Sequence, residues 1–359
     1  MLHVHLDALD ILSDDGDHNA FTDCAYWRHR YWVAFRKAVS HNITPPGIIE
    51  IHTMTDEAWH TWDWTETLTL YGTFGKTQTT DIRDPRFLVT EEALYCFVGV
   101  YQPAPLRQEL AEDSAANSIR TYVTHTKDGR HWTPLTPILR AGHWGWSSAY
   151  NAQQGLLFVA AYYTGAHGEP SSITLWSGTS AYTLRPHATI YDGAALFEAD
   201  APHFYPSEPY LFPLESRLLG CCVRSEAGVD IGVGRPPYQT ADWRWRKTTA
   251  RVHISGSVLT PYGRFMVGRE LPPQTLLSKA THNTASPTVA LWRLTGEGLE
   301  HYHTFPSYGD CAYAGITATA HPGTYLVSYY SQSKPRPKSL TLPGAAVYVA
   351  TITLTLDSH

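Results

Sequence analysis

Short apolar or alternating apolar–polar runs recur along the whole chain and are separated by Gly, Pro, Asp and Ser. The runs are rich in Val, Tyr, Phe and Trp, a composition typical of β-strands. The clearest runs cover residues 31–35, 94–100, 155–163, 218–223, 264–267 and 324–330. Amphipathic helical windows are nearly absent, and the best one, 106–118, predicts either a mobile loop or one short helix. So many short, regularly spaced strands indicate a sandwich, a barrel or a propeller.

A weak internal repeat favours the propeller. The sequence Thr-Lys-Asp-Gly-Arg-His-Trp at 126–132 follows an expected strand, and looser versions of it occur at 55–62 and 177–182. An Asp in such a hairpin turn can cap backbone N–H groups, and the aromatic residue can pack back onto the strands. Repeats about 50–70 residues apart match one four-stranded blade each. We therefore predict a single all-β domain over residues 1–359, a six-bladed β-propeller of four-stranded antiparallel blades with a closing strand at 345–356.

The composition excludes several classes of protein. Of the 359 residues, 43% are hydrophobic and only 17% are charged, which argues against disorder. The net charge is −6 and no basic run exceeds a few residues, so nucleic acid is not an expected partner. No stretch approaches about 18 apolar residues, so no membrane span is expected. Because the N-terminus also lacks the features of a signal peptide, we expect a cytoplasmic protein, or a secreted one if a leader has been removed.

The cysteines and histidines do not predict a cofactor. The five cysteines are odd in number, Cys221 and Cys222 are adjacent, and no CxxC spacing occurs. Neither a disulfide framework nor a zinc knuckle is therefore indicated, and buried thiols in a reducing compartment are the simplest interpretation. The chain has 19 His, but no HExxH motif occurs, and the His3-Val-His5 pair at the terminus is interpreted as incidental. No metal and no cofactor are expected.

The segment 207–224 is predicted to be a β-hairpin. Two apolar runs flank a polar turn at Glu215-Ser216-Arg217, and a turn centred on Ser216 places Glu208 directly opposite Arg224. An acid and a guanidinium are then held side by side on rigid strands. Two interpretations remain open, a structural surface ion pair or a functional charge pair.

A second hairpin is predicted over 18–41, with its turn near His29-Arg30. This centre pairs Asp23 with Arg36 and also His18 with His41. Asp23 and His18 are an odd number of residues apart, so a regular strand would point them to opposite faces. Either a bulge intervenes or only one pair faces a site. Each His alone is best explained as structural, whereas the paired arrangement favours a functional role.

Three further segments carry candidate chemistry. In Arg-Asp-Pro-Arg, Pro85 favours an extended backbone at Asp84, so that Asp84 and Arg86 are presented at the start of a strand. Arg269 ends another predicted strand. Asp310 and Tyr313 lie in Ser-Tyr-Gly-Asp-Cys-Ala-Tyr-Ala-Gly, where the small neighbours leave the Tyr313 phenol sterically open. The alternatives are a turn-capping Asp and a core Tyr.

The His-Trp-Gly-Trp run at 143–146 has two interpretations. Trp144 and Trp146 either stack on sugar faces or fill the core of a blade, and His143 is a candidate proton donor.

The motifs in this order resemble those of the sialidase-like six-bladed β-propeller proteins, including bacterial chains called exo-α-sialidases. The pattern is His-x-Ala-Phe-x-Asp … Phe-Arg … His, Arg-Asp-Pro-Arg, Asp-Gly-x-x-Trp, Ser-Glu … Arg, Pro-Pro-Tyr … Trp, Gly-Arg and Tyr-Gly-Asp-x-x-Tyr-x-Gly. It covers about residues 18–330. The resemblance implies a clamp of three arginines for the substrate carboxylate, a Tyr nucleophile, a Glu that activates it and an Asp acid/base.

By motif, Tyr313 resembles the nucleophile and Glu208 the activating acid. Arg224 resembles the middle arginine and Arg269 the third.

The remaining roles stay open. The acid/base is either Asp23 or Asp84, and Arg36 is the candidate for the first arginine, because the family's Arg-Ile-Pro motif is absent and His-Asn-Ala-Phe stands in its place. The other residues that we expect at the substrate are His18, His41, Arg86, His143, Trp144 and Asp310.

The resemblance implies an exo-acting glycoside hydrolase that cleaves a terminal, anionic sugar from a glycan. A tyrosine nucleophile suits such a substrate, because a carboxylate nucleophile would repel it. One alternative is a propeller polysaccharide lyase that uses His143, Tyr205 or Tyr210, and Arg224 on a uronic acid glycan. The other is a non-catalytic propeller that binds a glycan or a protein. The sequence predicts no oligomeric state.

Overall fold

The computed structural model describes residues 1–41, 46–59, 61–74, 77–101, 119–163, 172–192, 206–215, 217–225, 228–271, 287–332 and 344–357. Almost all regular structure in these residues is β, arranged as six antiparallel sheets, five of four strands and one of five. The helical segments in these ranges are the 3₁₀ turns η1 (Asp56–Ala58), η3 (Ala181–Thr183) and η4 (Thr240–Asp242). None of these described helical segments has the length and apolar character that crossing a membrane requires. The predicted loop or helix at 106–118 lies outside the described residues.

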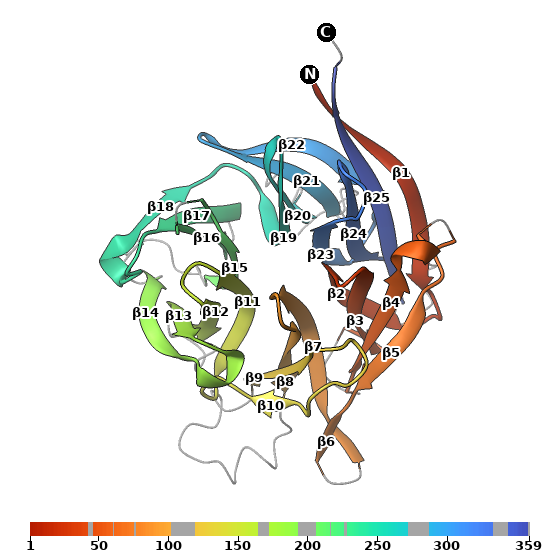
Figure 1. The fold of residues 1–359 in the computed structure, drawn as a ribbon, viewed down its shortest axis with the longest axis horizontal. Helices are drawn as coiled ribbons and strands as arrows, with labels where there is room; N and C mark the ends of the chain where they lie inside the picture. The colour runs from red at the N-terminus through yellow and green to blue at the C-terminus, as the bar shows by residue number, and fades with distance from the viewer. Residues whose placement is uncertain are drawn as a thin grey trace, which may run out of the picture. The chain divides into compact units, whose positions relative to one another are not determined.

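The chain divides into two compact units, Met1–Leu70 with Ala250–His359, and Tyr71–Thr249. We call them unit 1 and unit 2 and describe each by itself (Figure 1). The sheets of unit 1 contain β2 (His18–Trp27), β3 (Arg30–Ala38), β4 (Ile48–Thr55) and β5 (Thr65–Leu70); β19 (Val252–Thr260), β20 (Gly263–Glu270), β21 (Thr288–Thr295) and β22 (Gly298–Phe305); and β23 (Cys311–Ala318), β24 (Thr324–Ser331), β25 (Ala346–Leu356) and β1 (Leu2–Ser13).

The sheets of unit 2 contain β6 (Gly72–Phe74), β7 (Thr77–Val89), β8 (Leu94–Tyr101), β9 (Ile119–Thr126) and β10 (Thr136–Pro137); β11 (His143–Asn151), β12 (Leu156–Tyr163), β13 (Ser172–Gly178) and β14 (Arg185–Asp192); and β15 (Ser207–Pro213), β16 (Leu219–Ser225), β17 (Gly228–Gly234) and β18 (Trp243–Lys247). The six clearest strands predicted from the sequence are confirmed as β3, β8, β12, β16, β20 and β24.

Burial explains why these runs form strands in this order. The middle strand β12 is buried at five successive positions, as expected for a strand covered on both faces. The fourth strands, such as β5 and β18, are mostly exposed or half-buried. A continuous apolar run therefore marks a covered strand, and a run rich in charged or threonine residues marks an edge.

The first and last strands of the chain close one sheet. Strand β1 pairs with β25 from Leu2–Leu356 to Ser13–Val347, and Figure 1 shows the two strands side by side with both chain ends. The Met1 ammonium also contacts the Asp357 carboxylate at 2.6 Å. The predicted closing strand is confirmed, and it is the N-terminal segment that covers its edge.

The register of both predicted hairpins differs from the expectation. The β2–β3 turn is Arg28-His29, both with positive φ, which matches a two-residue turn. Ala20, not Asp23, lies opposite Arg36. The predicted pairings of Asp23 with Arg36 and of His18 with His41 were therefore wrong. The turn lies one residue earlier than predicted, which pairs Asp23 with Ala34, and a bulge at Phe21 and Thr22 shifts the rest of β2 by one further residue.

The same kind of bulge shifts the hairpin β15–β16. Ser207, not Glu208, lies opposite Arg224. The Glu208 and Arg224 side chains nevertheless form an ion pair. The predicted contact is thus confirmed, although the predicted backbone pairing was wrong by one residue.

Two smaller expectations concern side chains. All five cysteines are buried and free of disulfides, as predicted.

In the turn at 126–132, Asp128 Oδ1 accepts hydrogen bonds from the backbone N–H groups of Arg130 and His131, both at 2.8 Å. The carboxylate therefore caps this turn as expected.

The packing of β2 on β23 generates a first prediction. A Cβ on Gly315 would lie 2.4 Å from the backbone nitrogen of Cys24 and 2.6 Å from Asp23 Oδ1. Since a backbone atom cannot yield as a flexible side chain can, Gly315→Ala is expected to lower the free energy of unfolding by about 1–3 kcal/mol. Denaturant unfolding measures this loss. Gly296→Ala is the matched control, because a Cβ there meets nothing within 4 Å, and an equal loss in both variants would contradict the prediction.

Candidate functional site

Each described sheet has a strand with a one-residue β-bulge, which we call its bulged strand: β2, β19 and β23 in unit 1, and β7, β11 and β15 in unit 2. In unit 1 the bulges fall between Ala20 and Asp23, Ile254 and Gly256, and Ala312 and Gly315. In unit 2 they fall between Arg83 and Arg86, Gly145 and Ser147, and Ser207 and Tyr210. Bulges re-aim side chains and are over-represented beside active sites.

Four bulges hold a non-glycine residue in the left-handed region. The φ angles are 58° at Phe21, 53° at Asp84, 50° at Glu208 and 41° at Tyr313. A side chain in this region costs about 1–3 kcal/mol and persists only when its surroundings demand it. The prediction of an extended backbone at Asp84 was therefore wrong, because its φ is positive. Three of these four residues are predicted catalytic residues, so the strained positions coincide with the candidate chemistry.

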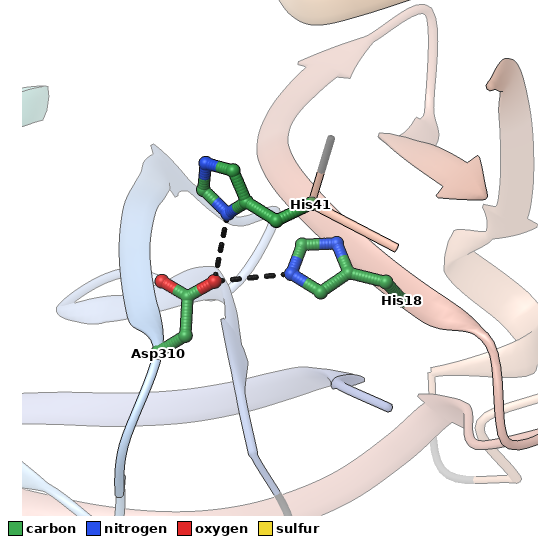
Figure 2. Close-up of side chains that lie close together, drawn as sticks. All are labelled: His18, His41 and Asp310. Carbon is green, nitrogen blue, oxygen red and sulfur yellow. Dashed lines mark hydrogen bonds and ion pairs between the residues drawn. The ribbon is translucent and has the colours of Figure 1, made fainter. Parts of the chain in front are cut away.

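In unit 1, a carboxylate lies between two imidazoles (Figure 2). Asp310 Oδ2 is 3.0 Å from His18 Nε2 and 2.9 Å from His41 Nδ1. The other oxygen, Oδ1, accepts a hydrogen bond from the Tyr330 hydroxyl at 3.1 Å. The three predicted residues His18, His41 and Asp310 thus meet at one point, although they come from distant parts of the chain.

Burial and hydrogen bonding set the charge of this cluster. Burial alone would raise the pKa of Asp310, but the hydrogen bonds and charges of His18 and His41 hold it well below the usual range. Burial lowers the pKa of His18, and the contact with Asp310 opposes this only in part. An ionised Asp310 beside a neutral His18 that donates Nε2–H is therefore the state at neutral pH.

Phe21 connects this cluster to Tyr313. The Phe21 ring lies 5.2 Å from the rings of both His41 and Tyr313, and 5.6 Å from that of Tyr330, all edge to face. The Thr22 hydroxyl donates a hydrogen bond to the Tyr313 carbonyl at 2.9 Å. The bulges of β2 and β23 thereby fix each other, and they place Tyr313 beside the histidine cluster.

The two predicted arginines of unit 1 have different environments. The Arg36 side chain is 0% exposed and donates to the Ser40 carbonyl at 2.9 Å, an environment typical of a core residue. Arg269 is half-buried, and its Nη2 lies 3.0 Å from His253 Nδ1. Burial raises the pKa of Cys311 to about 12, and the positive charge of Arg269 partly opposes this rise. Arg269 therefore lies close to the strand that carries Tyr313.

Asp23 is half-buried at the end of the β2 bulge. Its Oδ1 accepts a hydrogen bond from the Cys24 backbone N–H at 2.9 Å. Burial, and then the charge of Asp23, raise the pKa of the Cys24 thiol. Asp23 keeps a solvent-facing part, so the choice between Asp23 and Asp84 as acid/base stays open.

In unit 2, the ion pair of Glu208 and Arg224 occupies the β15 bulge. Asp84 is buried at the β7 bulge. Arg86 is also buried, and its guanidinium carbon lies 5.2 Å from the centre of the Trp146 ring. This contact links Arg86 of β7 to Trp146 of β11.

The tryptophans at 144 and 146 fill the core. Trp144 is buried, stacks on Tyr162 at 5.8 Å and meets Tyr101 edge to face at 5.3 Å. Trp146 is buried as well. The burial of both rings therefore favours the core-filling interpretation over sugar binding.

His143 is enclosed by aromatic rings. Its ring lies 5.2 Å from that of Tyr163 and 5.4 Å from that of Trp176, and burial lowers its pKa. Of the two lyase candidates, Tyr205 lies outside the described residues, and Tyr210 stacks on Phe212.

Sequence reasoning missed two members of the site, Phe21 and Tyr330. Phe21 was visible only as part of a motif, and Tyr330 as the end of an apolar strand. The sequence signal for Phe21 is its place between two smaller residues, Ala20 and Thr22. Tyr313 likewise lies between two small residues, both alanines.

These sheets, each with its bulged strand, define a six-bladed β-propeller of the sialidase-like fold. No protein-family model matches the sequence, and no curated protein does. A protein of unknown function from Dyadobacter fermentans DSM 18053 is similar in structure, with a TM-score of 0.73, 12% identity, and 98% of this chain and 99% of that chain covered.

Two enzymes of known activity are also similar in structure. Trypanosoma rangeli sialidase with the inhibitor DANA has a TM-score of 0.65 and 9% identity, over 97% of this chain and 58% of that chain. The GH93 α-L-arabinofuranosidase of Fusarium graminearum with arabinobiose has a TM-score of 0.60 and 9% identity, over 96% and 97%. At such identities the similarity establishes the fold.

The Asp310 cluster generates a second prediction. The pKa of Asp310 is lower in the folded state than in the unfolded state, where it is about 3.9. The carboxylate therefore contributes its full stability above about pH 3.9. This stability is lost as the pH falls through the folded-state pKa. Asp310→Asn is expected to cost about 1–3 kcal/mol at neutral pH and less at about pH 3. Denaturant unfolding of both proteins at the two pH values measures this. A deficit that stays the same in acid would contradict the assignment.

Proposed function

We propose that this chain is a glycoside hydrolase that removes a terminal, anionic sugar from a glycan, with Tyr313 as the nucleophile and Glu208 as its base. One observation carries the proposal. Tyr313, Glu208 and Asp84 each occupy the bulge of a bulged strand, and each has a positive φ. Non-glycine residues held in this strained region cluster at active sites.

Several features support a glycosidase over other chemistry. The fold is shared with a sialidase and with an α-L-arabinofuranosidase. A phenol with a carboxylate base is the arrangement that the tyrosine-nucleophile glycosidases use in place of two carboxylates. The phenol attacks the anomeric carbon, its proton passes to Glu208, and Asp84 or Asp23 protonates the leaving oxygen.

The charge of the substrate follows from the arginines. Arg224 pairs with Glu208, and Arg269 lies near the Tyr313 strand. Guanidinium groups bind carboxylates through paired, charge-assisted hydrogen bonds. The proposed clamp therefore consists of Arg224 and Arg269, without the buried Arg36.

Tyr313→Phe and Glu208→Gln test the catalytic roles. Removing a base lowers kcat by about 10²–10⁴-fold, and we expect a loss at least as large for Tyr313→Phe. The assay follows reducing ends and ultraviolet absorbance on sialosides, uronides and arabinosides. The controls are the exposed Tyr308→Phe and Glu92→Gln.

Three results would contradict this assignment. Full turnover by Tyr313→Phe would show that another residue is the nucleophile. An ultraviolet-absorbing product identifies a lyase, because elimination creates a double bond. Glycan binding without turnover, unchanged in both variants, identifies a binding propeller.

Arg269→Met tests the charge of the substrate. Loss of a hydrogen bond to a charged group costs about 1.5–3 kcal/mol, so KM for an anionic substrate is expected to rise about 10–100-fold. KM for a neutral substrate of the same linkage should change little. Arg293→Met, at another half-buried arginine of the same sheet, is the control, and an equal rise for both substrates would argue against a carboxylate contact.

A further inference from the structure

Besides the candidate catalytic residues, unit 1 holds a set of side chains arranged as metal ligands. We propose that His18, His41 and Asp310 bind one divalent transition-metal ion. One donor atom from each residue lies within 4.8 Å of the other two. Figure 2 shows both imidazole nitrogens directed at the same carboxylate oxygen. The site does not depend on the proposed glycosidase activity.

The distances fit an ion with short metal–ligand bonds. The carboxylate oxygen lies 3.0 Å and 2.9 Å from the two imidazole nitrogens. With bonds of about 2.0–2.1 Å to nitrogen and oxygen, atoms this far apart subtend about 90° at the metal. Small side-chain rotations therefore suffice to place an ion between the three donors.

The support of the ligands also fits a metal site. The Tyr330 hydroxyl donates to the second oxygen of Asp310, which fixes the carboxylate in place. Such outer contacts orient ligands in metal sites. His18 approaches from β2, His41 follows β3, and Asp310 precedes β23, so the fold itself brings the three together.

Exposure indicates that the site is open on one side. The side chain of His18 is 3% exposed, that of Asp310 24% and that of His41 54%. Three protein ligands with an accessible side leave positions for water or another ligand. Imidazole and carboxylate together select zinc and similar first-row ions over magnesium or calcium, which prefer oxygen ligands.

The full chain without a polyhistidine tag is titrated with Zn²⁺ by calorimetry and with Co²⁺ by visible absorbance. We expect one ion per chain, and a cobalt spectrum that Zn²⁺ displaces. Tyr330→Phe is expected to weaken binding about tenfold. His41→Ala and Asp310→Asn should weaken it further, and His41 is exposed enough for its removal to leave the fold intact, which circular dichroism checks.

A second cluster supplies the matched control. Glu50, His52 and Glu66 also bring three donor atoms together, but the Lys37 ammonium lies 3.5 Å from Glu50 and already balances its charge. His52→Ala should therefore leave Zn²⁺ affinity unchanged. The proposal is overturned by an absence of stoichiometric binding, which would make the contacts of Asp310 simple hydrogen bonds. It is also overturned if binding survives both His41→Ala and Asp310→Asn, or disappears in His52→Ala.

Discussion

One extra residue in the bulged strand of each described sheet is the constraint from which the candidate site follows. A bulge leaves backbone groups outside the ladder, and buried groups of this kind need partners. Side-chain hydroxyls supply them across sheets: Thr22 donates to the Tyr313 carbonyl, Ser255 to that of Ala314 and Ser147 to that of Pro209. Each hydroxyl satisfies a carbonyl and at the same time ties neighbouring sheets within its unit.

The same constraint explains where the chemistry lies. A bulged residue with positive φ is turned out of the regular alternation of the strand, so its side chain is free to serve something other than the sheet. Phe21 and Tyr313 use this freedom in opposite ways. Phe21 packs inward against His41 and Tyr330, whereas Tyr313 remains half-buried beside it. The backbone cost at Tyr313 is offset by the contacts of its neighbour.

The strands could be predicted from the sequence because apolar runs report burial directly, as in β12. The register could not, because a bulge adds one residue without changing the composition of the run. This is why Glu208 was placed opposite Arg224 in the backbone. Asp23 was paired with Arg36 because the turn was predicted one residue too late in the chain. The resemblance places His18 and Asp310 at the same site, but their direct hydrogen bond could not be predicted from spacing, since 292 residues separate them.

The His-Asn-Ala-Phe segment changes the electrostatics of unit 1 relative to a three-arginine clamp. Arg36 is buried and committed to a backbone carbonyl, and burial keeps His18 neutral. The Asp310 carboxylate would repel an anionic substrate group, although the charge of Arg269, which acts on the neighbouring Tyr330, opposes that repulsion. A divalent ion held by His18, His41 and Asp310 would reverse the sign of the charge at this point. Such an ion would add positive charge beside Tyr313 and so would strengthen the binding of an anionic substrate, although the proposed clamp of Arg224 and Arg269 does not require it.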